Sequence, residues 1–320
     1  MKTTGLGKVN PAAFIFDCDP GADDAVELLM AMACPEVFQI LGITTVGGNV
    51  DIERVTHNTL SLCTLAGRED IPVFQGCPRP LVAHPTHAIE AHGETGIGGA
   101  ILPQPQGTKH PKHAVNFLID QLSSTTMPIT LVCSAPLTNM AVALTMAPHI
   151  KANIQEILIM GGALTSGNIT AAAEFNFFCD PHAAHVVLAS GVPITLIGLD
   201  ITHKVCATPK RLDQLRALNS EVGREVAAML ETGLAYDQEN FGLPGRAIHD
   251  ACLSAYVLRP DLFKTKRAHV HVETQSQENQ GACHVSFYPR FLESTATQVV
   301  YEADGDGIFD VILTTLGRYS

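Results

Sequence analysis

The sequence has no tryptophan, and aromatic residues of any kind make up only 6% of its 320 residues. It also lacks an apolar run long enough to cross a membrane, since the longest, such as residues 192–199, falls far short of the roughly 20 residues that a spanning helix needs. Residues 1–12 contain no apolar segment of the kind that directs secretion. The sequence therefore predicts neither a membrane partner nor export.

The nine cysteines include no pair separated by two residues and show no regular spacing. Zinc and iron–sulfur sites usually draw on such spacings, so neither is expected. An odd number of cysteines, without a secretory segment, favours reduced thiols. We therefore expect a cytoplasmic protein.

Basic residues are scarce, because 20 lysines and arginines stand against 32 aspartates and glutamates, for a net charge of −12. A surface of this sign repels the phosphates of nucleic acids and of anionic membranes. No nucleic-acid partner is therefore expected. A small neutral or cationic substrate, or a metal ion, fits this charge better.

The apolar pattern is typical of a soluble α/β protein, in which 46% of the residues are hydrophobic and 16% charged. Short β-branched segments alternate with longer amphipathic ones, which predicts one open, doubly wound, mostly parallel sheet with helices on both faces. Residues 268–302 alternate with period two and predict shorter strands, which form either an antiparallel extension that would make the sheet mixed or a small sub-sheet. No linker divides the chain, so residues 1–320 are expected to form a single domain. The predicted strands are Ala13–Phe16, Phe38–Val46, Ile129–Cys133, Glu156–Met160 and Ile194–Leu199, and the predicted helices are Ala25–Ala33, Ile52–Ala66, His113–Leu122, Leu137–Met146 and Pro181–Ala189.

Two stretches lack strong periodicity: residues 75–109, rich in glycine, proline and histidine, and residues 232–247. Each is predicted to be a long loop, and long loops in compact α/β proteins often carry function. Ligands of open α/β sheets bind at the carboxyl ends of the strands, so we expect the functional polar residues to lie there.

Four aspartates follow the first predicted strand within eight residues, at positions 17, 19, 23 and 24. Carboxylates this close repel one another, and a bound divalent cation removes the conflict. A ligand set made only of oxygen atoms favours Ca²⁺ or Mg²⁺ over zinc. Asp23 and Asp24 would also suit the first turn of a helix, where acidic residues are favourable. That explanation does not account for Asp17 and Asp19, which lie at the end of an apolar strand, where a buried charge is costly.

The segment from Asp17 to Ala25, Asp-Cys-Asp-Pro-Gly-Ala-Asp-Asp-Ala, resembles the amino-terminal fingerprint of the nucleoside hydrolases, the inosine–uridine-preferring family. The resemblance implies a Rossmann-like nucleoside hydrolase fold. It also implies hydrolysis of the N-glycosidic bond of ribonucleosides to free base and ribose, by a homodimer or homotetramer. Further similar segments follow in the family's order at residues 44–50, 92–96, 136–139, 160–162, 167–168, 173–176, 180–181, 198–200 and 249–250.

The resemblance implies one Ca²⁺ per subunit, held by Asp19, Asp24, Asp250 and the backbone carbonyl of Ser134. A calcium-bound water would be the nucleophile and Asp19 its general base, with Asp17 behind the ligands, orienting them. The family usually has Thr-Gly-Pro where this chain has Ser134-Ala135-Pro136. The alanine restricts the backbone there, which makes Ser134 the weakest of the four assignments.

A sugar that develops oxocarbenium character needs polar groups around it. The resemblance assigns these groups by their positions in the family's motifs. Asn168 and Asn176 are also typical of loops, and Met160 equally fits core packing. The residues that the resemblance assigns are Asp23 and Asn176 for the 2′-hydroxyl, Asn168 and Glu174 for the 5′-hydroxyl, Met160 beneath the ring, Phe175 within the same motif, and Asn49 close to Asp19 and the water.

His249 adjoins Asp250 and is expected to protonate the leaving base, although a lone histidine at a helix start is more often structural. His92, in the first predicted loop, would help to close the pocket over the base. Without tryptophan the chain cannot stack an indole on a purine, so Tyr236 and Phe241 are the aromatic candidates for contacting the base. The His-Asp pair favours a broad or pyrimidine-tolerant ribohydrolase.

Other functions remain open from the sequence. The Asp17-Cys18-Asp19 start also resembles the haloacid-dehalogenase-type phosphatases, which use Mg²⁺, although Pro20 and Gly21 depart from their pattern. A protein that binds calcium or nucleosides without catalysis is a further alternative. An EF-hand-like loop at residues 304–307 is excluded because its later ligand positions are missing.

Overall fold

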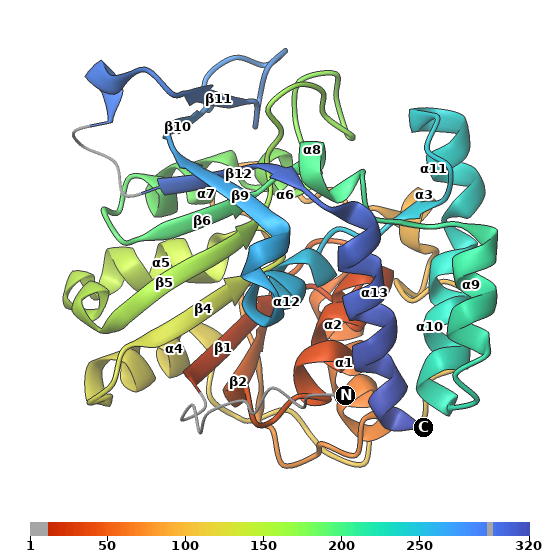
Figure 1. Cartoon of the computed structure of the whole chain (residues 1–320). Coiled ribbons are helices and arrows are strands. Elements are labelled where there is room, and N and C mark those ends of the chain that lie inside the picture. Colours follow the sequence, from red (N-terminus) through yellow and green to blue (C-terminus); the bar gives the residue numbers. More distant parts are fainter. Residues whose placement is uncertain (1–11, 293–296) are drawn as a thin grey trace, which may run out of the picture.

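The computed structural model describes residues 12–292 and 297–320, and an eight-stranded sheet runs through it (Figure 1). The strand order is β3-β2-β1-β4-β5-β6-β12-β9, and every neighbouring pair is parallel except β12 with β9. The strands are β1 (Ala12–Cys18), β2 (Phe38–Thr45), β3 (Val73–Gln75), β4 (Ile129–Cys133), β5 (Ile154–Met160), β6 (Ile194–Ile197), β9 (Phe263–Arg267) and β12 (Thr297–Ala303).

Helices cover both faces of this sheet (Figure 1). One apolar core joins the sheet to α1, α10, α12 and α13, and a second joins it to α4, α5 and α7. The central strands are buried on both sides, which explains their almost continuous apolar sequences. The helices are α1 (Ala22–Met32), α2 (Ile52–Leu65), α3 (Ile89–His92), α4 (Ala114–Ser124), α5 (Thr138–Met146), α6 (Phe175–Cys179), α7 (Pro181–Leu188), α8 (Leu199–Thr202), α9 (Pro209–Arg216), α10 (Glu221–Thr232), α11 (Leu234–Phe241), α12 (Ala251–Leu258) and α13 (Gly305–Leu316).

The predicted fold class is confirmed, because the sheet is open, mostly parallel and covered by helices on both faces. Both alternatives for residues 268–302 are present in part. β12 joins the main sheet and pairs antiparallel with β9, whereas β10 (His269–Val272) and β11 (Cys283–Ser286) form a separate antiparallel two-stranded sheet. No helix in the part of the chain that the structure describes is long and apolar enough to span a membrane.

The prediction of a long loop at residues 232–247 is wrong. These residues form α11 and then β8 (Arg246–Ala247), which pairs with β7 (Cys206–Ala207). The stretch mixes charged, aromatic and glycine residues, so it has only a weak apolar stripe, and packing of the helix on neighbouring elements decides its conformation. Residues 75–109 are largely irregular and contain the last residue of β3 and the short helix α3.

The sheet brings the acidic segment to the point where its strand order reverses. From β1 the chain moves outward through β2 and β3, and it then returns to form β4 on the other side of β1. In open α/β sheets the loops at such a point diverge and leave a crevice for a ligand. Asp19 lies just after β1, Asn49 after β2 and Ser134 after β4, so all three meet at this crevice.

Candidate active site

Asp19 lies at the bottom of the crevice and is completely buried. Its Oδ2 accepts a hydrogen bond of 2.6 Å from the backbone N–H of Asn49, whose side-chain amide donates to the Asp19 carbonyl at 3.2 Å. Oδ1 of Asp19 is buried without a hydrogen-bond partner in the structure. Burial, followed by the charge of Asp24, raises the pKa of Asp19 well above its usual range. A buried carboxylate with an unpartnered oxygen and a raised pKa needs either a proton or a cation.

Three further carboxylates gather beside it, those of Asp23, Asp24 and Asp250, and each offers an oxygen within 4.8 Å of the others. All three are buried, and burial, with the charge of Asp23, raises the pKa of Asp24 to about 7. Oδ1 of Asp23 has no hydrogen-bond partner either. Clustered buried carboxylates with unsatisfied oxygens fit a hard divalent cation. The group could therefore hold a metal ion.

The structure groups these carboxylates differently from the expected ligand set. Asp24 and Asp250 are in the group, but the third member is Asp23, which was assigned to the sugar, and not Asp19. Asp19 stays next to the group, because its backbone N–H donates to Oδ1 of Asp24 at 3.2 Å. Both residues are also joined by Asn49, whose amide donates to Oδ2 of Asp24 at 3.2 Å.

Ser134 lies where β4 ends and faces the same cluster. Its hydroxyl donates to Glu27 at 2.7 Å and lies 3.3 Å from Oδ1 of Asp24, while its carbonyl accepts from the amide of Asn176 at 3.0 Å. Glu27 was not predicted as part of the site. It is a fully buried acid one turn further along α1, and one of its oxygens has no partner. The only signal in the sequence is an acid among the apolar residues that follow the first turn of α1.

Asp17 lies inside β1 and does not line the cavity. Its Oδ1 accepts hydrogen bonds from the Thr44 hydroxyl at 2.6 Å and the Asn139 amide at 2.8 Å. Its backbone carbonyl accepts from the N–H of Ser134 at 3.0 Å. Burial raises the pKa of Asp17 to about 6 despite these hydrogen bonds. Asp17 therefore ties together the ends of β1, β2 and β4, from which the site residues project.

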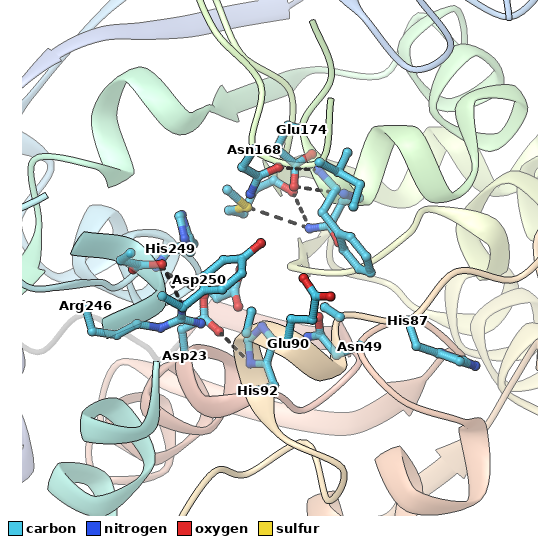
Figure 2. Close-up of a pocket in the computed structure, with 18 of the residues that line it drawn as sticks. Asp23, Asn49, His87, Glu90, His92, Asn168, Glu174, Arg246, His249 and Asp250 are labelled. Carbon is cyan, nitrogen blue, oxygen red and sulfur yellow. Dashed lines mark hydrogen bonds and ion pairs between the residues drawn. The ribbon is translucent and has the colours of Figure 1, made fainter. Parts of the chain in front are cut away.

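Above the cluster is a cavity of about 410 Å³ (Figure 2). The carboxyl ends of β4 and β5, the loop before α6, the helices α3 and α11, and the segment around β8 supply its walls. Every residue expected to contact the substrate lines it. They are Asp23, Asn49, His92, Met160, Asn168, Glu174, Phe175, Asn176 and Tyr236, with Ser134, His249 and Asp250.

One wall carries the residues expected to hold the ribose. Both oxygens of Glu174 accept backbone N–H groups, Oε1 from Asn176 at 2.8 Å and Oε2 from Gly162 at 2.9 Å, while Oδ1 of Asn168 accepts from Phe175 at 2.9 Å. The Asn176 amide also donates to the carbonyl of Met160 at 3.2 Å. Since these side chains are held by the backbone, they form a rigid polar wall.

The opposite side of the cavity holds the two expected histidines (Figure 2). Nδ1 of His249 lies 2.8 Å from the Thr202 hydroxyl, and Nδ1 of His92 accepts from the N–H of Ala22 at 3.1 Å. Burial, as the first cause, lowers the pKa of His249 to about 3 and that of His92 to about 4. Both rings are therefore uncharged at neutral pH in the protein without substrate.

Aromatic side chains from α11 close the cavity near His249. The rings of Tyr236 and Phe241 meet edge to face with their centroids 5.9 Å apart, and Phe241 lies 5.6 Å from the ring of His203. His203 in turn lies 5.7 Å from His249. Tyr236 and Phe241, the aromatic candidates from the sequence, thus both line the cavity.

This wall also contains an ion pair that was not predicted from the sequence. Arg246 and Asp237 are each 2% exposed, and their side chains meet at 2.9 Å. Both line the cavity together with His87, Glu90 and the apolar residues Ile89 and Ile169. Arg246 lies three residues before His249, in a segment taken for a loop, where charged side chains are usually solvated. Nothing in that pattern indicated that it would be buried.

Comparisons with known proteins agree with this geometry. A family model described as inosine-uridine preferring nucleoside hydrolase matches residues 14–310. An uncharacterised protein of Schizosaccharomyces pombe is 41% identical over 95% of this chain and 98% of its own length, and the pyrimidine-specific ribonucleoside hydrolase RihA of Photobacterium profundum is 38% identical over the same shares. The solved structure of a purine-preferring ribonucleoside hydrolase from Gardnerella vaginalis has a TM-score of 0.88 at 30% identity, covering 95% of this chain and 98% of that one. The chain therefore belongs to the inosine-uridine preferring nucleoside hydrolase family and is a hydrolase of N-glycosyl bonds.

Proposed function

We propose that this enzyme hydrolyses ribonucleosides with Asp19 as general base, His249 as the acid for the leaving base, and Ca²⁺ as its metal. The observation that carries the proposal is the buried Asp19 carboxylate, which has one unpartnered oxygen and lies beside three further carboxylates at the base of the cavity. A general base must lie within hydrogen-bonding reach of the water it activates, and the unpartnered Oδ1 is free to accept that proton.

The proposed metal ligands are Asp19, Asp24, Asp250 and the carbonyl of Ser134, and the structure makes Asp23 a further candidate. Oxygen donors of this kind suit calcium. Bound Ca²⁺ would supply the positive charge that makes a neighbouring water easier to deprotonate. Asn49 donates hydrogen bonds to Asp19 and Asp24 and so holds the two carboxylates in place. The unsatisfied oxygens of Asp19 and Asp23 support a cation at this position.

The sugar would lie between the carboxylate cluster and the wall of Asn168, Glu174 and Asn176. In the proposed reaction the bond from C1′ to the base nitrogen breaks, and its electron pair leaves with the base. Water forms the new bond to C1′ and gives its proton to Asp19. Polar groups fixed before the substrate arrives can stabilise the positive charge on the sugar without having to reorganise. Asp23 and Asn176 would meet the 2′-hydroxyl, and Asn168 and Glu174 the 5′-hydroxyl.

His249 would deliver a proton to the departing base. Burial keeps its ring uncharged while the cavity holds no substrate. Negative charge that develops on the base favours the protonated ring, since an opposite charge nearby stabilises it, and solvent supplies the proton that the uncharged ring lacks. The hydrogen bond between Nδ1 and Thr202 orients the ring so that its other nitrogen can serve the base.

We expect the enzyme to accept several bases, with pyrimidines among them. The relative from Photobacterium profundum is named as pyrimidine-specific and the one from Gardnerella vaginalis as purine-preferring, so both classes must be tested. The base side of the cavity is lined by Tyr236, Phe241 and two histidines, a surface compatible with either ring system.

The deciding experiment incubates the purified enzyme with inosine, uridine, cytidine, adenosine and xanthosine and measures free ribose, with and without a chelator. Ribose release that stops on chelation and returns with Ca²⁺ supports the proposal. Tight binding of a nucleoside without release of ribose would show a non-catalytic binding protein. Release of phosphate from nucleotides, without any free base, would favour the phosphatase alternative.

A further inference from the structure

Arg246 places a permanent positive charge in the wall of the cavity. It is 2% exposed, and it is the one lysine or arginine among the described residues that line the cavity. A guanidinium stays charged at any physiological pH. Burying it is costly unless the charge serves a purpose or is fully compensated. The carboxylate that contacts it directly is that of Asp237.

Asp237 anchors the guanidinium firmly. Its Oδ1 accepts from Nη1 of Arg246 at 2.9 Å, and its Oδ2 accepts from the backbone N–H of Ala247 at 2.7 Å. A Cβ at Gly233 would lie 2.7 Å from the guanidinium carbon, so the side chain also packs closely against the junction of α10 and α11. These contacts hold the charge in one place, which is the condition for electrostatic stabilisation without reorganisation.

These contacts do not occupy every N–H group of the guanidinium. Nε of Arg246 is buried and has no hydrogen-bond partner in the structure. Figure 2 shows the side chain extending along the cavity toward Asp23 and His92, on the opposite side from Asn168 and Glu174. The arginine therefore lies on the side of Asp23 and His92, away from the proposed contacts to the 5′-hydroxyl.

We propose that Arg246 stabilises the negative charge of the departing nucleobase and thereby selects bases that carry carbonyl oxygens. The inference rests on the proposed function, which it deepens. When the bond between C1′ and the base nitrogen breaks, the electron pair moves into the base and spreads onto its carbonyl oxygens. A fixed guanidinium nearby lowers the energy of that anion, and a proton then neutralises it. Uracil, with two carbonyl oxygens, is the type of base that gains most.

The test compares uridine with p-nitrophenyl riboside, whose nitrophenolate leaves easily without help. Replacing Arg246 alone would leave Asp237 as a buried, unpaired carboxylate, so both charges are removed in Arg246→Met with Asp237→Asn. We expect kcat for uridine to fall about 10²-fold, the scale seen when one preorganised donor is removed. The rate on p-nitrophenyl riboside should change several-fold less. Arg246→Lys, which keeps the charge, should recover part of the uridine rate.

The outcomes separate the possibilities. Equal losses on both substrates, with no recovery in Arg246→Lys, would show that the pair only holds α11 in place and would overturn the proposal. An unchanged uridine rate would overturn it as well. Thermal unfolding of each variant, with and without Ca²⁺, identifies any general loss of structure. If the wild-type enzyme releases no base from any nucleoside, the proposed function fails and the role of Arg246 fails with it.

Discussion

The backbone N–H of Asn49 and Oδ2 of Asp19 are 2.6 Å apart, and this hydrogen bond occupies one oxygen of the carboxylate while the other stays unpartnered. The bond joins the loop after β2 to the loop after β1. The proposed base is therefore positioned by backbone geometry as well as by its own rotamer.

Asp19→Asn should reduce kcat by several orders of magnitude. The amide can still accept the hydrogen bond from Asn49, but it cannot take a proton from water, and a general base contributes about 10²–10⁴-fold. Steady-state rates with uridine measure the loss. Asp120→Asn, at an exposed carboxylate that pairs with Lys112, is a matched control and should have wild-type activity. Retention of more than about a tenth of the wild-type rate in Asp19→Asn would place the base elsewhere.

Gly48→Ala should damage the site without replacing any polar side chain. A Cβ at this position would overlap the Asp19 carboxylate, so that side chain has to move. We expect kcat to fall by at least about 10-fold, since small displacements of catalytic groups are costly. Gly107→Ala is the control, because a Cβ there meets only Leu60 at 3.9 Å, an ordinary contact. Equal activity in the two variants would mean that the position of Asp19 does not matter.

Calcium should stabilise the folded enzyme through the carboxylate cluster. Ligand that binds only the folded state adds about 2.7 kcal/mol when its free concentration is about 100 times Kd. Asp250→Asn should abolish the calcium-induced rise in Tm while leaving the metal-free protein at least as stable, because one of the repelling carboxylates is gone. Differential scanning calorimetry with and without Ca²⁺ measures both effects. A full calcium shift in this variant would exclude Asp250 as a ligand.

His249→Ala should separate activation of the leaving group from the rest of the reaction. We predict a fall in kcat on inosine of about 10²-fold or more, the usual scale of general-acid help. The loss should be far smaller on p-nitrophenyl riboside, whose phenolate leaves without a proton. KM for that substrate should change little, because the ribose contacts remain. Equal losses on both substrates would assign His249 a structural role.

Glu174 should make stability depend on pH. Burial, as the largest cause, raises the pKa of its carboxyl from 4.5 to about 7. Below pH 4.5 both the folded and unfolded states hold the proton. Between pH 4.5 and about 7 only the unfolded state ionises, so stability falls as pH rises, by at most about 1.4 kcal/mol per pH unit from this group. Urea unfolding across this window should show a flatter dependence in Glu174→Gln, and parallel curves for the two proteins would contradict the prediction.

The predicted fold depended on patterns that are local in the chain. The central strands are buried on both faces, and their apolar runs were recognisable for that reason. The strand β3, with three residues, is too short to carry such a signal. Residues 234–241 were taken for a loop because α11 is stabilised by contacts with β8 and α10 and not by a strong apolar stripe. The expected single domain and homo-oligomer stay predictions.

The sequence by itself determined the chemistry at the end of β1, since four aspartates within eight residues conflict in any fold that brings them together. Only the tertiary structure decided which carboxylates meet, because Asp250 comes from a strand-to-helix segment more than 200 residues away from Asp23 and Asp24. It also decided that Arg246 and Asp237 are buried as an ion pair. In the sequence they are two ordinary charged residues nine positions apart, and only the packing of α11 against β8 buries both in the wall of the cavity. Burial depends on contacts between distant segments, and no local pattern of charges encodes them.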